Sequence, residues 1–152
     1  MSVNPIPDGY HSVSAYMIIK DAKSAISFYQ KAFNAKAKGQ LTTPDGAIMH
    51  GEMIIGNSHI MYGEENAEMD MLSPQTLNGC SVSLCIYVED ADALFNQAIE
   101  AGATAVKPME DQFWGDRAGT VQDPYGYSWT LMSKIEDVEW DEVQNRLTEM
   151  MS

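Results

Sequence analysis

The sequence predicts an α+β fold of two βαβββ modules that pair into a half-open barrel. An offset of 69 residues, the difference between positions 90 and 21, aligns Asp21 with Asp90 and Lys38 with Lys107. In both copies the aspartate stands between a β-rich run and a run of helical periodicity. The 152 residues favour one domain with a shared core, because a module of roughly 70 residues buries too little surface alone. We therefore expect a single domain over residues 1–152.

The first module is expected over residues 12–63. Alternating β-forming residues predict a strand at 12–19. Asp21 can cap a helix over Ala22–Phe33, whose apolar residues share one face. Three strands follow at 35–42, 47–55 and 58–62, with turn residues at 44–46 and at 56–57 between them.

The second module is expected over residues 80–134, after an acidic, methionine-rich linker at 64–79. Its elements are a strand at 81–88, a helix from Asp90 to Ala101 and extended structure at 104–109. A loop that contains Trp114, Asp116 and Arg117 then leads into a hairpin, which turns at Asp123-Pro124-Tyr125-Gly126. With one inserted residue, Gly56 aligns with Gly126.

The last segment, residues 136–151, has the pattern of an amphipathic helix. It is acidic at its start, and we expect its apolar stripe to cover a sheet edge of this chain or of a partner. That stripe consists of Trp140, Val143, Leu147 and Met150.

Composition excludes several classes of partner. Twenty-two acidic and nine basic residues give a net charge of −13, which repels nucleic acid and anionic membranes. No apolar run approaches the roughly 20 residues of a membrane span, and the N-terminal segment has no signal-peptide pattern. We expect a cytoplasmic protein in which Cys80 and Cys85 are free thiols.

Two segments of the second module point to a family. Trp114-Gly115-Asp116-Arg117 followed by Asp123-Pro124-Tyr125-Gly126 resembles the closing hairpin of the glyoxalase/bleomycin-resistance/extradiol-dioxygenase superfamily, the vicinal oxygen chelate fold. The combination is similar to its PhnB-like branch, and the resemblance extends from about Ser12 to Val138. It implies modules that pair within one chain or by exchange between the chains of a dimer, with a concave pocket for a small molecule. We expect a homodimer, and either arrangement of the modules is compatible with the sequence.

The resemblance also identifies the positions where metal-dependent members hold a divalent ion. Those positions, on the first and fourth strands of each module, are Ser14, Ile60, Ser83 and Thr130. None offers the imidazole, carboxylate or thiolate donor that such an ion needs. Among the neighbouring positions, only His59 could coordinate. The sequence therefore predicts no metal and no other cofactor.

His50 and Glu52 are the candidate catalytic residues. They stand two apart on a predicted strand and so share one face, as a general base and its orienting carboxylate or as groups that line a pocket. The alternative is an ordinary polar pair that faces solvent or the interface between the modules. The run from Met49 to Met53 resembles a His-x-Glu strand in the PhnB-like branch.

Other candidates lie on the first strands and near the hairpin. Trp114 could stack on a planar ligand and Arg117 could bind a carboxylate or phosphate; alternatively, Arg117 pairs with Asp116 or a strand-end carboxylate and Trp114 is core. Tyr16 shares a face with Ser14. The predicted ligand-binding set is Ser14, Tyr16, His50, Glu52, Ser83, Trp114, Arg117 and Thr130.

Three functions remain open at this point. The leading one is metal-free binding of a small organic molecule at the concave face, with catalysis undecided. The second is a divalent-metal-dependent lyase, isomerase or dioxygenase, with His50, Glu52 and His59 as ligands. The third is antibiotic resistance by sequestration, as the resemblance to bleomycin-binding proteins implies.

Overall fold

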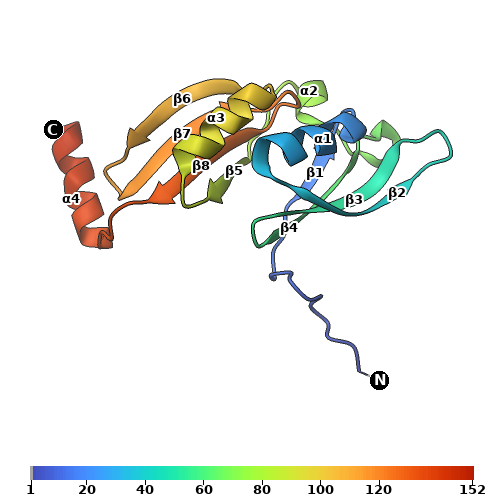
Figure 1. The fold of residues 1–152 in the computed structure, drawn as a ribbon, viewed down its shortest axis with the longest axis horizontal. Helices are drawn as coiled ribbons and strands as arrows, with labels where there is room; N and C mark the ends of the chain where they lie inside the picture. Colours follow the sequence, from blue (N-terminus) through green and yellow to red (C-terminus); the bar gives the residue numbers. More distant parts are fainter. Residues whose placement is uncertain (1) are drawn as a thin grey trace. The chain divides into compact units, whose positions relative to one another are not determined.

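The computed structural model describes residues 2–152, which form two compact units, one ending at Ser81 and the other spanning Val82–Ser152. Each unit contains a four-stranded sheet with a long helix along one side (Figure 1). This confirms the predicted α+β fold of two βαβββ modules. Neither sheet closes into a barrel by itself. The pairing of the modules into a half-open barrel stays a prediction.

The first unit places its first and last strands side by side at one edge. Strand β1 runs parallel to β4, and the other neighbours are antiparallel, in the order β1-β4-β3-β2. The elements are β1 (Tyr16–Ile19), α1 (Ala22–Phe33), β2 (Lys36–Thr42), β3 (Ile48–Ile55) and β4 (Ser58–Glu64).

Strand β1 is shorter than the predicted strand at 12–19. Its pairing with β4 starts where Tyr16 lies opposite Met61. The carbonyl of Ala15 still accepts a hydrogen bond from the Met61 amide at 3.0 Å, but the residues before it form no ladder pair with β4. Ser14 therefore precedes β1 instead of lying within it.

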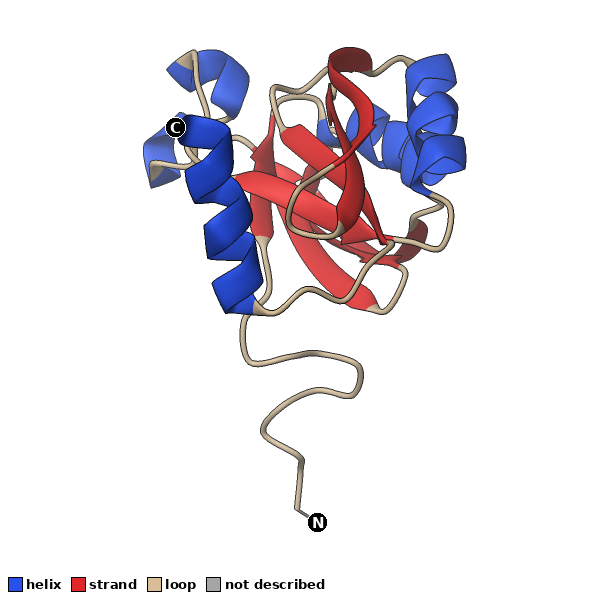
Figure 2. Ribbon diagram, turned by 90° about the vertical axis from the view of Figure 1, so that its left-hand side faces the viewer, coloured by secondary structure: helices blue, strands red, loops and turns tan. Residues whose placement is uncertain are grey.

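The segment before β1, drawn as a tan loop in Figure 2, is attached to the sheet near its end. His59 Nδ1 lies 2.8 Å from the carbonyl oxygen of Gly9, to which it can donate a hydrogen bond. The ring of Tyr10 stacks on the imidazole of His59 with centroids 4.3 Å apart. A Cβ on Gly9 would come within 2.4 Å of that imidazole, so the contact requires glycine.

Helix α1 is capped as predicted and has a second cap. The Asp21 side chain accepts from the Ser24 amide at 3.3 Å. The carboxylate of Glu64, at the end of β4, accepts from the amides of Asp21 and Ala22 at 2.9 and 3.0 Å. These bonds satisfy amides that a helix leaves unpaired at its first turn. The buried stripe contains every residue expected for it, Ala25, Ile26, Tyr29, Ala32 and Phe33, together with Ala22 and Phe28.

The predicted linker at 64–79 is partly helical, contrary to expectation. It contains a 3-10 turn, Ala67–Met69, and a short helix α2, Pro74–Leu77. Ser73 accepts from the Thr76 amide, and proline stands at the first helical position. Serine followed by proline is a helix-start signal that the acidic composition obscured.

The second unit repeats the arrangement in the order β5-β8-β7-β6, with β5 parallel to β8. Asp90 caps α3 through the Ala93 amide at 3.0 Å, and Gly102 ends it with φ of 122°, as the sequence predicts. The elements are β5 (Ser83–Tyr87), α3 (Ala91–Ala101), β6 (Thr104–Asp111), β7 (Asp116–Gln122), β8 (Ser128–Lys134) and α4 (Trp140–Met151).

The closing hairpin turns where the sequence predicts. Buried Asp123 accepts hydrogen bonds from the amides of Tyr125 and Tyr127 and from Trp129 Nε1, all within 2.9 Å. The predicted loop before it is too long, however. Asp116 and Arg117 already belong to β7, because they pair with Lys134 and Ser133 of β8.

Helix α4 begins at Trp140, four residues later than predicted. The amides of Ile135 and Glu136 bond to the Gly115 carbonyl, which keeps that part of the chain extended. Arg146 ties the helix to its unit through Glu136 and the Phe113 carbonyl, at 2.7 and 3.1 Å. Trp140 and Met150 are 85% and 65% exposed, whereas Val143 and Leu147 are half-buried, so only part of the apolar stripe is covered within the described chain.

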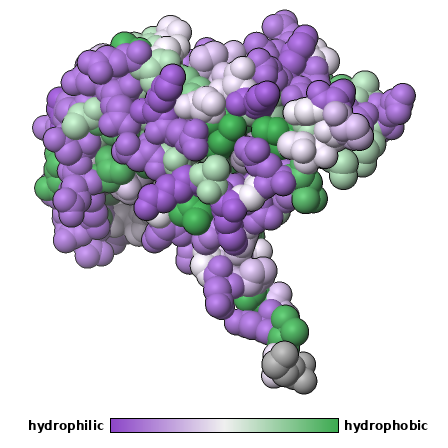
Figure 3. All heavy atoms as spheres, turned by 45° about the vertical axis from the view of Figure 1, so that its right-hand side comes forward, coloured by the Kyte–Doolittle hydropathy of each residue, from purple (hydrophilic) through white to green (hydrophobic). Residues whose placement is uncertain are grey.

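The helices of residues 2–152 include none that is both long and apolar enough to cross a membrane. The face shown in Figure 3 is mostly hydrophilic, with scattered apolar side chains, as the net charge of −13 suggests.

Candidate functional site

The side of the first sheet that faces away from α1 is called here the first open face. Register defines its members, because side chains alternate between the two sides of a strand. Tyr16, Met61 and Glu52 lie opposite one another across β1, β4 and β3. His50 follows Glu52 on the same side at a spacing of two. The intervening residues Gly51 and Met53 are buried toward α1.

Three predicted residues of this face form a hydrogen-bonded chain. The Tyr16 hydroxyl lies 3.2 Å from His50 Nδ1, and His50 Nε2 lies 3.1 Å from Glu52 Oε2. An ionised carboxylate can only accept, so in the neutral imidazole Nε2 holds the proton and donates to Glu52. Nδ1 then accepts from the Tyr16 hydroxyl. We call this arrangement the Tyr16–His50–Glu52 relay.

Gly63 makes the relay possible. It is the β4 residue between Tyr16 and His50, and a Cβ there would approach the Tyr16 hydroxyl to 2.9 Å and the Met49 carbonyl oxygen to 2.7 Å. Without a side chain at this position, the tyrosine reaches across β4 to the imidazole. No local sequence pattern identifies Gly63, because its role depends on strand register.

The relay is accessible without being fully exposed. The side chains of His50 and Glu52 are 29% and 30% exposed, and Tyr16 is 41% exposed. In the relay a carboxylate orients an imidazole, and the second imidazole nitrogen faces a hydroxyl. An imidazole held in this way can activate a hydroxyl or accept a proton from a bound molecule. The predicted role of His50 as base and Glu52 as its orienter is therefore geometrically possible.

His59 does not join this group. It lies opposite Ile54, farther along β3, and its Nδ1 bonds to Gly9. Among residues 2–152, no three His, Cys, Asp or Glu side chains are arranged to hold a metal ion. The register also corrects the position expected for a fourth-strand ligand: Ile60 is buried toward α1, and Met61 is on the open face.

The correction arises from the two hairpins. A two-residue turn separates β3 from β4, since Ile55 pairs with Ser58, whereas Gln122 pairs with Ser128 across five residues. An alignment of Gly56 with Gly126 therefore places β4 one residue out of register with β8, the fourth strand of the second module. The position that corresponds to Thr130 is Met61.

The second open face, on the side of the second sheet away from α3, contains two further predicted residues. Ser83 starts β5 opposite Ser128, and Thr130 lies opposite Cys85. The hydroxyls of Thr130 and Thr120 are 2.9 Å apart and satisfy each other. These groups offer hydroxyls to a ligand but no strong base.

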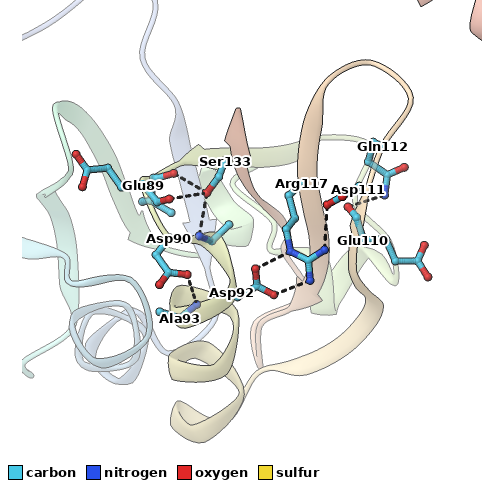
Figure 4. A network of polar contacts seen from close by, with 11 residues as sticks. Glu89, Asp90, Asp92, Ala93, Glu110, Asp111, Gln112, Arg117 and Ser133 are labelled. Atoms are coloured by element: carbon cyan, nitrogen blue, oxygen red, sulfur yellow. Dashed lines mark hydrogen bonds and ion pairs between the residues drawn. The ribbon is translucent and has the colours of Figure 1, made fainter. Parts of the chain in front are cut away.

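Arg117 is engaged on the other side of this sheet, beside α3 (Figure 4). Its Nε and Nη2 donate to the two carboxylate oxygens of Asp92 at 2.6 and 2.9 Å, and Nη1 donates to Asp111 at 3.0 Å. The guanidinium holds the pKa of the Asp92 carboxyl below its usual range. Asp111 ends β6, so the contact is the ion pair with a strand-end carboxylate that was one of the two alternatives.

Trp114 belongs to a cluster that no local sequence pattern predicts. Its Nε1 donates to Asp116 Oδ2 at 2.8 Å, and the Tyr87 hydroxyl donates to the same oxygen at 2.8 Å. Asp116 is 5% exposed, whereas Trp114 and Tyr87 are 39% and 61% exposed. The hydrogen bond to Asp116 raises the pKa of Tyr87.

Comparison with known proteins identifies relatives over nearly the full length. The uncharacterized protein Mb0911c of Mycobacterium bovis is 38% identical over 147 residues, which cover 95% of this chain and 94% of that protein. The Arabidopsis thaliana protein At5g48480 is 26% identical over 117 residues, 72% of this chain and 70% of the relative.

Solved structures agree in fold. The crystal structure of the At5g48480 product has a TM-score of 0.65 at 22% identity, over 80% of this chain and 98% of that one. The PhnB protein of Bacillus cereus has a TM-score of 0.61 at 18% identity, over 81% and 99%. At these identities the likeness concerns the fold alone.

The family model described as Glyoxalase/Bleomycin resistance protein/Dioxygenase superfamily matches residues 11–131. This range contains both βαβββ modules up to the middle of β8. It confirms the family that the hairpin segments suggested. The chain belongs to the glyoxalase/bleomycin resistance protein/dioxygenase superfamily.

Proposed function

We propose that this protein binds a small organic molecule on its first open face and that His50 accepts a proton from it. The observation behind the proposal is the Tyr16–His50–Glu52 relay, with its distances of 3.2 and 3.1 Å. Two separate strands contribute to it, and Gly63 leaves the space that it needs.

Each relay member has a distinct role in the proposal. Glu52 fixes the imidazole with Nε2 protonated, so that the basic nitrogen Nδ1 points toward Tyr16. A ligand group that approaches the Tyr16 hydroxyl gives up its proton through that hydroxyl or directly to Nδ1. Positioned general bases of this kind typically accelerate a reaction by about 10²–10⁴-fold.

The proposal includes neither a metal nor another cofactor. The donor set on this face supports that choice. His50 and Glu52 could supply a metal ion with two ligands, and the Tyr16 hydroxyl is already hydrogen-bonded to His50. We also place the chain in the PhnB-like branch, on the run from Met49 to Met53 and the segment from Trp114 to Arg117. A cytoplasmic homodimer remains part of the proposal.

Native mass spectrometry of freshly purified protein tests the proposal, combined with a saturation-transfer NMR screen of small carbonyl and carboxyl compounds. We expect a dimer without stoichiometric metal, and compounds that bind the native chain but not His50→Gln or Tyr16→Phe. His11→Gln is the matched control, because His11 is exposed and lies in the segment before β1.

Two results would contradict the proposal. Compounds that bind His50→Gln as tightly as the native chain would show that the relay does not form the site. One tightly bound divalent ion per subunit would show that the protein is a metal-dependent member of the superfamily.

A further inference from the structure

Asp116 is a buried carboxylate that the relay does not use and that belongs to the other unit. It is 5% exposed and makes no ion pair with any of residues 2–152. Both of its hydrogen bonds come from neutral donors, Trp114 Nε1 and the Tyr87 hydroxyl. Both fall on Oδ2, so Oδ1 accepts none from the described chain. A buried charge that is balanced only by neutral donors is unusual, because desolvation penalises it.

Neighbouring cations make no ion pair with this carboxylate. Lys134 lies opposite Asp116 in the pairing of β7 with β8, and its ammonium pairs with Asp137; the charge of Asp116 adds only a smaller contribution to its raised pKa. Arg117 follows Asp116 in sequence, yet its side chain lies on the α3 side and bonds to Asp92 and Asp111. The carboxylate is therefore left without an ion pair on the second open face.

Two aromatic rings border this charge. Tyr87 comes from β5 and reaches across β8 to Asp116 on β7, and Trp114 comes from the turn that precedes β7. Because both donors meet one oxygen, the edges of both rings converge on the carboxylate. Their exposed fractions of 61% and 39% leave ring surface for a ligand.

We propose that Trp114, Tyr87 and Asp116 form a site for an organic ammonium group. Aromatic faces attract a cation through their quadrupole, and a nearby carboxylate supplies the opposite charge. The net charge of −13 concentrates cations around the protein and excludes anions. This site lies in the second unit and does not depend on the proposed function of the relay.

Choline is the probe, and its uncharged carbon analogue, dimethylbutanol, is the matched ligand control. The chain has three tryptophans, so its NMR spectrum contains three indole N–H signals. We expect choline to shift the Trp114 signal saturably, with Trp129 and Trp140 as internal references. Dimethylbutanol should bind at least about tenfold more weakly, because it lacks the charge that the aromatic rings and Asp116 attract.

Asp116→Asn is the decisive variant. The asparagine oxygen can still accept from Trp114 and Tyr87, so the rings keep their places while the charge is lost. We expect choline affinity to fall by about tenfold or more. Tyr87→Leu provides a second measurement that retains the charge and removes one ring, and it should also weaken binding.

Three outcomes would overturn this proposal. They are the absence of a saturable shift at Trp114, equal binding of choline and dimethylbutanol, and unchanged choline binding by both Asp116→Asn and Tyr87→Leu. A purely structural role of Asp116 in holding the turn predicts the first of these.

Discussion

The two units have the same strand order and the same helix placement, but their open faces differ in chemistry. Register aligns Tyr16 with Cys85, because each lies opposite the equivalent residue of its fourth strand, Met61 or Thr130. In the same way Glu52 corresponds to Thr120. The residue two before Thr120, in the place of His50, is Ala118. Only the first unit therefore has the relay.

The helix-facing sides are far more alike. Gly51 and Gly119 correspond, and each admits a large neighbour: a Cβ would lie 2.4 Å from the Tyr62 ring in the first unit and 2.5 Å from Met109 Sδ in the second. Large side chains such as Tyr29 and Trp129 fill the buried layers. Packing constrains these sides, whereas the open faces are left to differ in function.

Substitutions in the hairpin turns should give the largest difference in stability change between the two units. Asp123→Ala should destabilise the protein by about 3 kcal/mol, because it leaves the buried Trp129 Nε1 and two turn amides without their acceptor. Urea unfolding followed by tryptophan fluorescence measures this change. Asn57→Ala, in the short exposed turn of the first unit, should change stability by less than about 0.5 kcal/mol. Equal effects would show that the turns are interchangeable.

The helix starts should differ by a smaller amount. Glu64→Ala removes a charged acceptor from the amides of Asp21 and Ala22 at the start of α1 and should cost about 2 kcal/mol. Ser133→Ala removes the hydroxyl that accepts from the Ala91 amide at 2.9 Å in α3 and should cost about 1 kcal/mol. Urea unfolding followed by circular dichroism compares them, with Glu68→Ala as an exposed control. A larger loss for Ser133→Ala would contradict this ranking.

The Arg117–Asp92 pair, shown in Figure 4, should make the stability of the second unit depend on pH in the acid range. Arg117 lowers the pKa of folded Asp92, so the stabilisation is present above the unfolded pKa of about 3.9 and is lost as pH falls through the folded value. The stability gap between native protein and Arg117→Met should therefore narrow between pH 5 and about pH 2. Urea unfolding at several pH values measures the gap, and a constant gap would refute the linkage.

The smallest expected effect on stability concerns the relay. Tyr16→Phe should change the free energy of unfolding by less than about 0.5 kcal/mol, because the site is partly solvated. It should nevertheless alter the imidazole signals of His50 in long-range nitrogen–proton NMR spectra and leave those of His11 unchanged. We expect native His50 to hold its proton on Nε2; a proton on Nδ1 would contradict the assigned direction of the relay.

Local patterns were sufficient for most of the elements. Asp21, Asp90 and Gly102 mark helix ends through bonds to amides or carbonyls a few residues away. The expected strand at 12–19 and the helix start at 136 failed because distant partners decide them: the pairing of β1 with β4 begins only at Tyr16, and the Gly115 carbonyl binds the amides of Ile135 and Glu136.

The candidate site was predictable only in part. The spacing of two placed His50 and Glu52 on one face, since strand geometry requires it. Their connection to Tyr16 depends on Gly63 and on the β1–β4 register, neither of which the sequence specifies locally. Ile60 was misplaced because the two hairpins have turns of different length.

The sequence by itself determined the βαβββ repeat, the family and the pairing of His50 with Glu52 on one strand face, because each depends on residues close together in the chain. Only the tertiary structure decided which side chains meet across strands: Tyr16 with His50, Arg117 with Asp92, and Trp114 and Tyr87 with Asp116. Those contacts follow from strand register, and a shift of one residue would turn each side chain to the opposite face of its sheet.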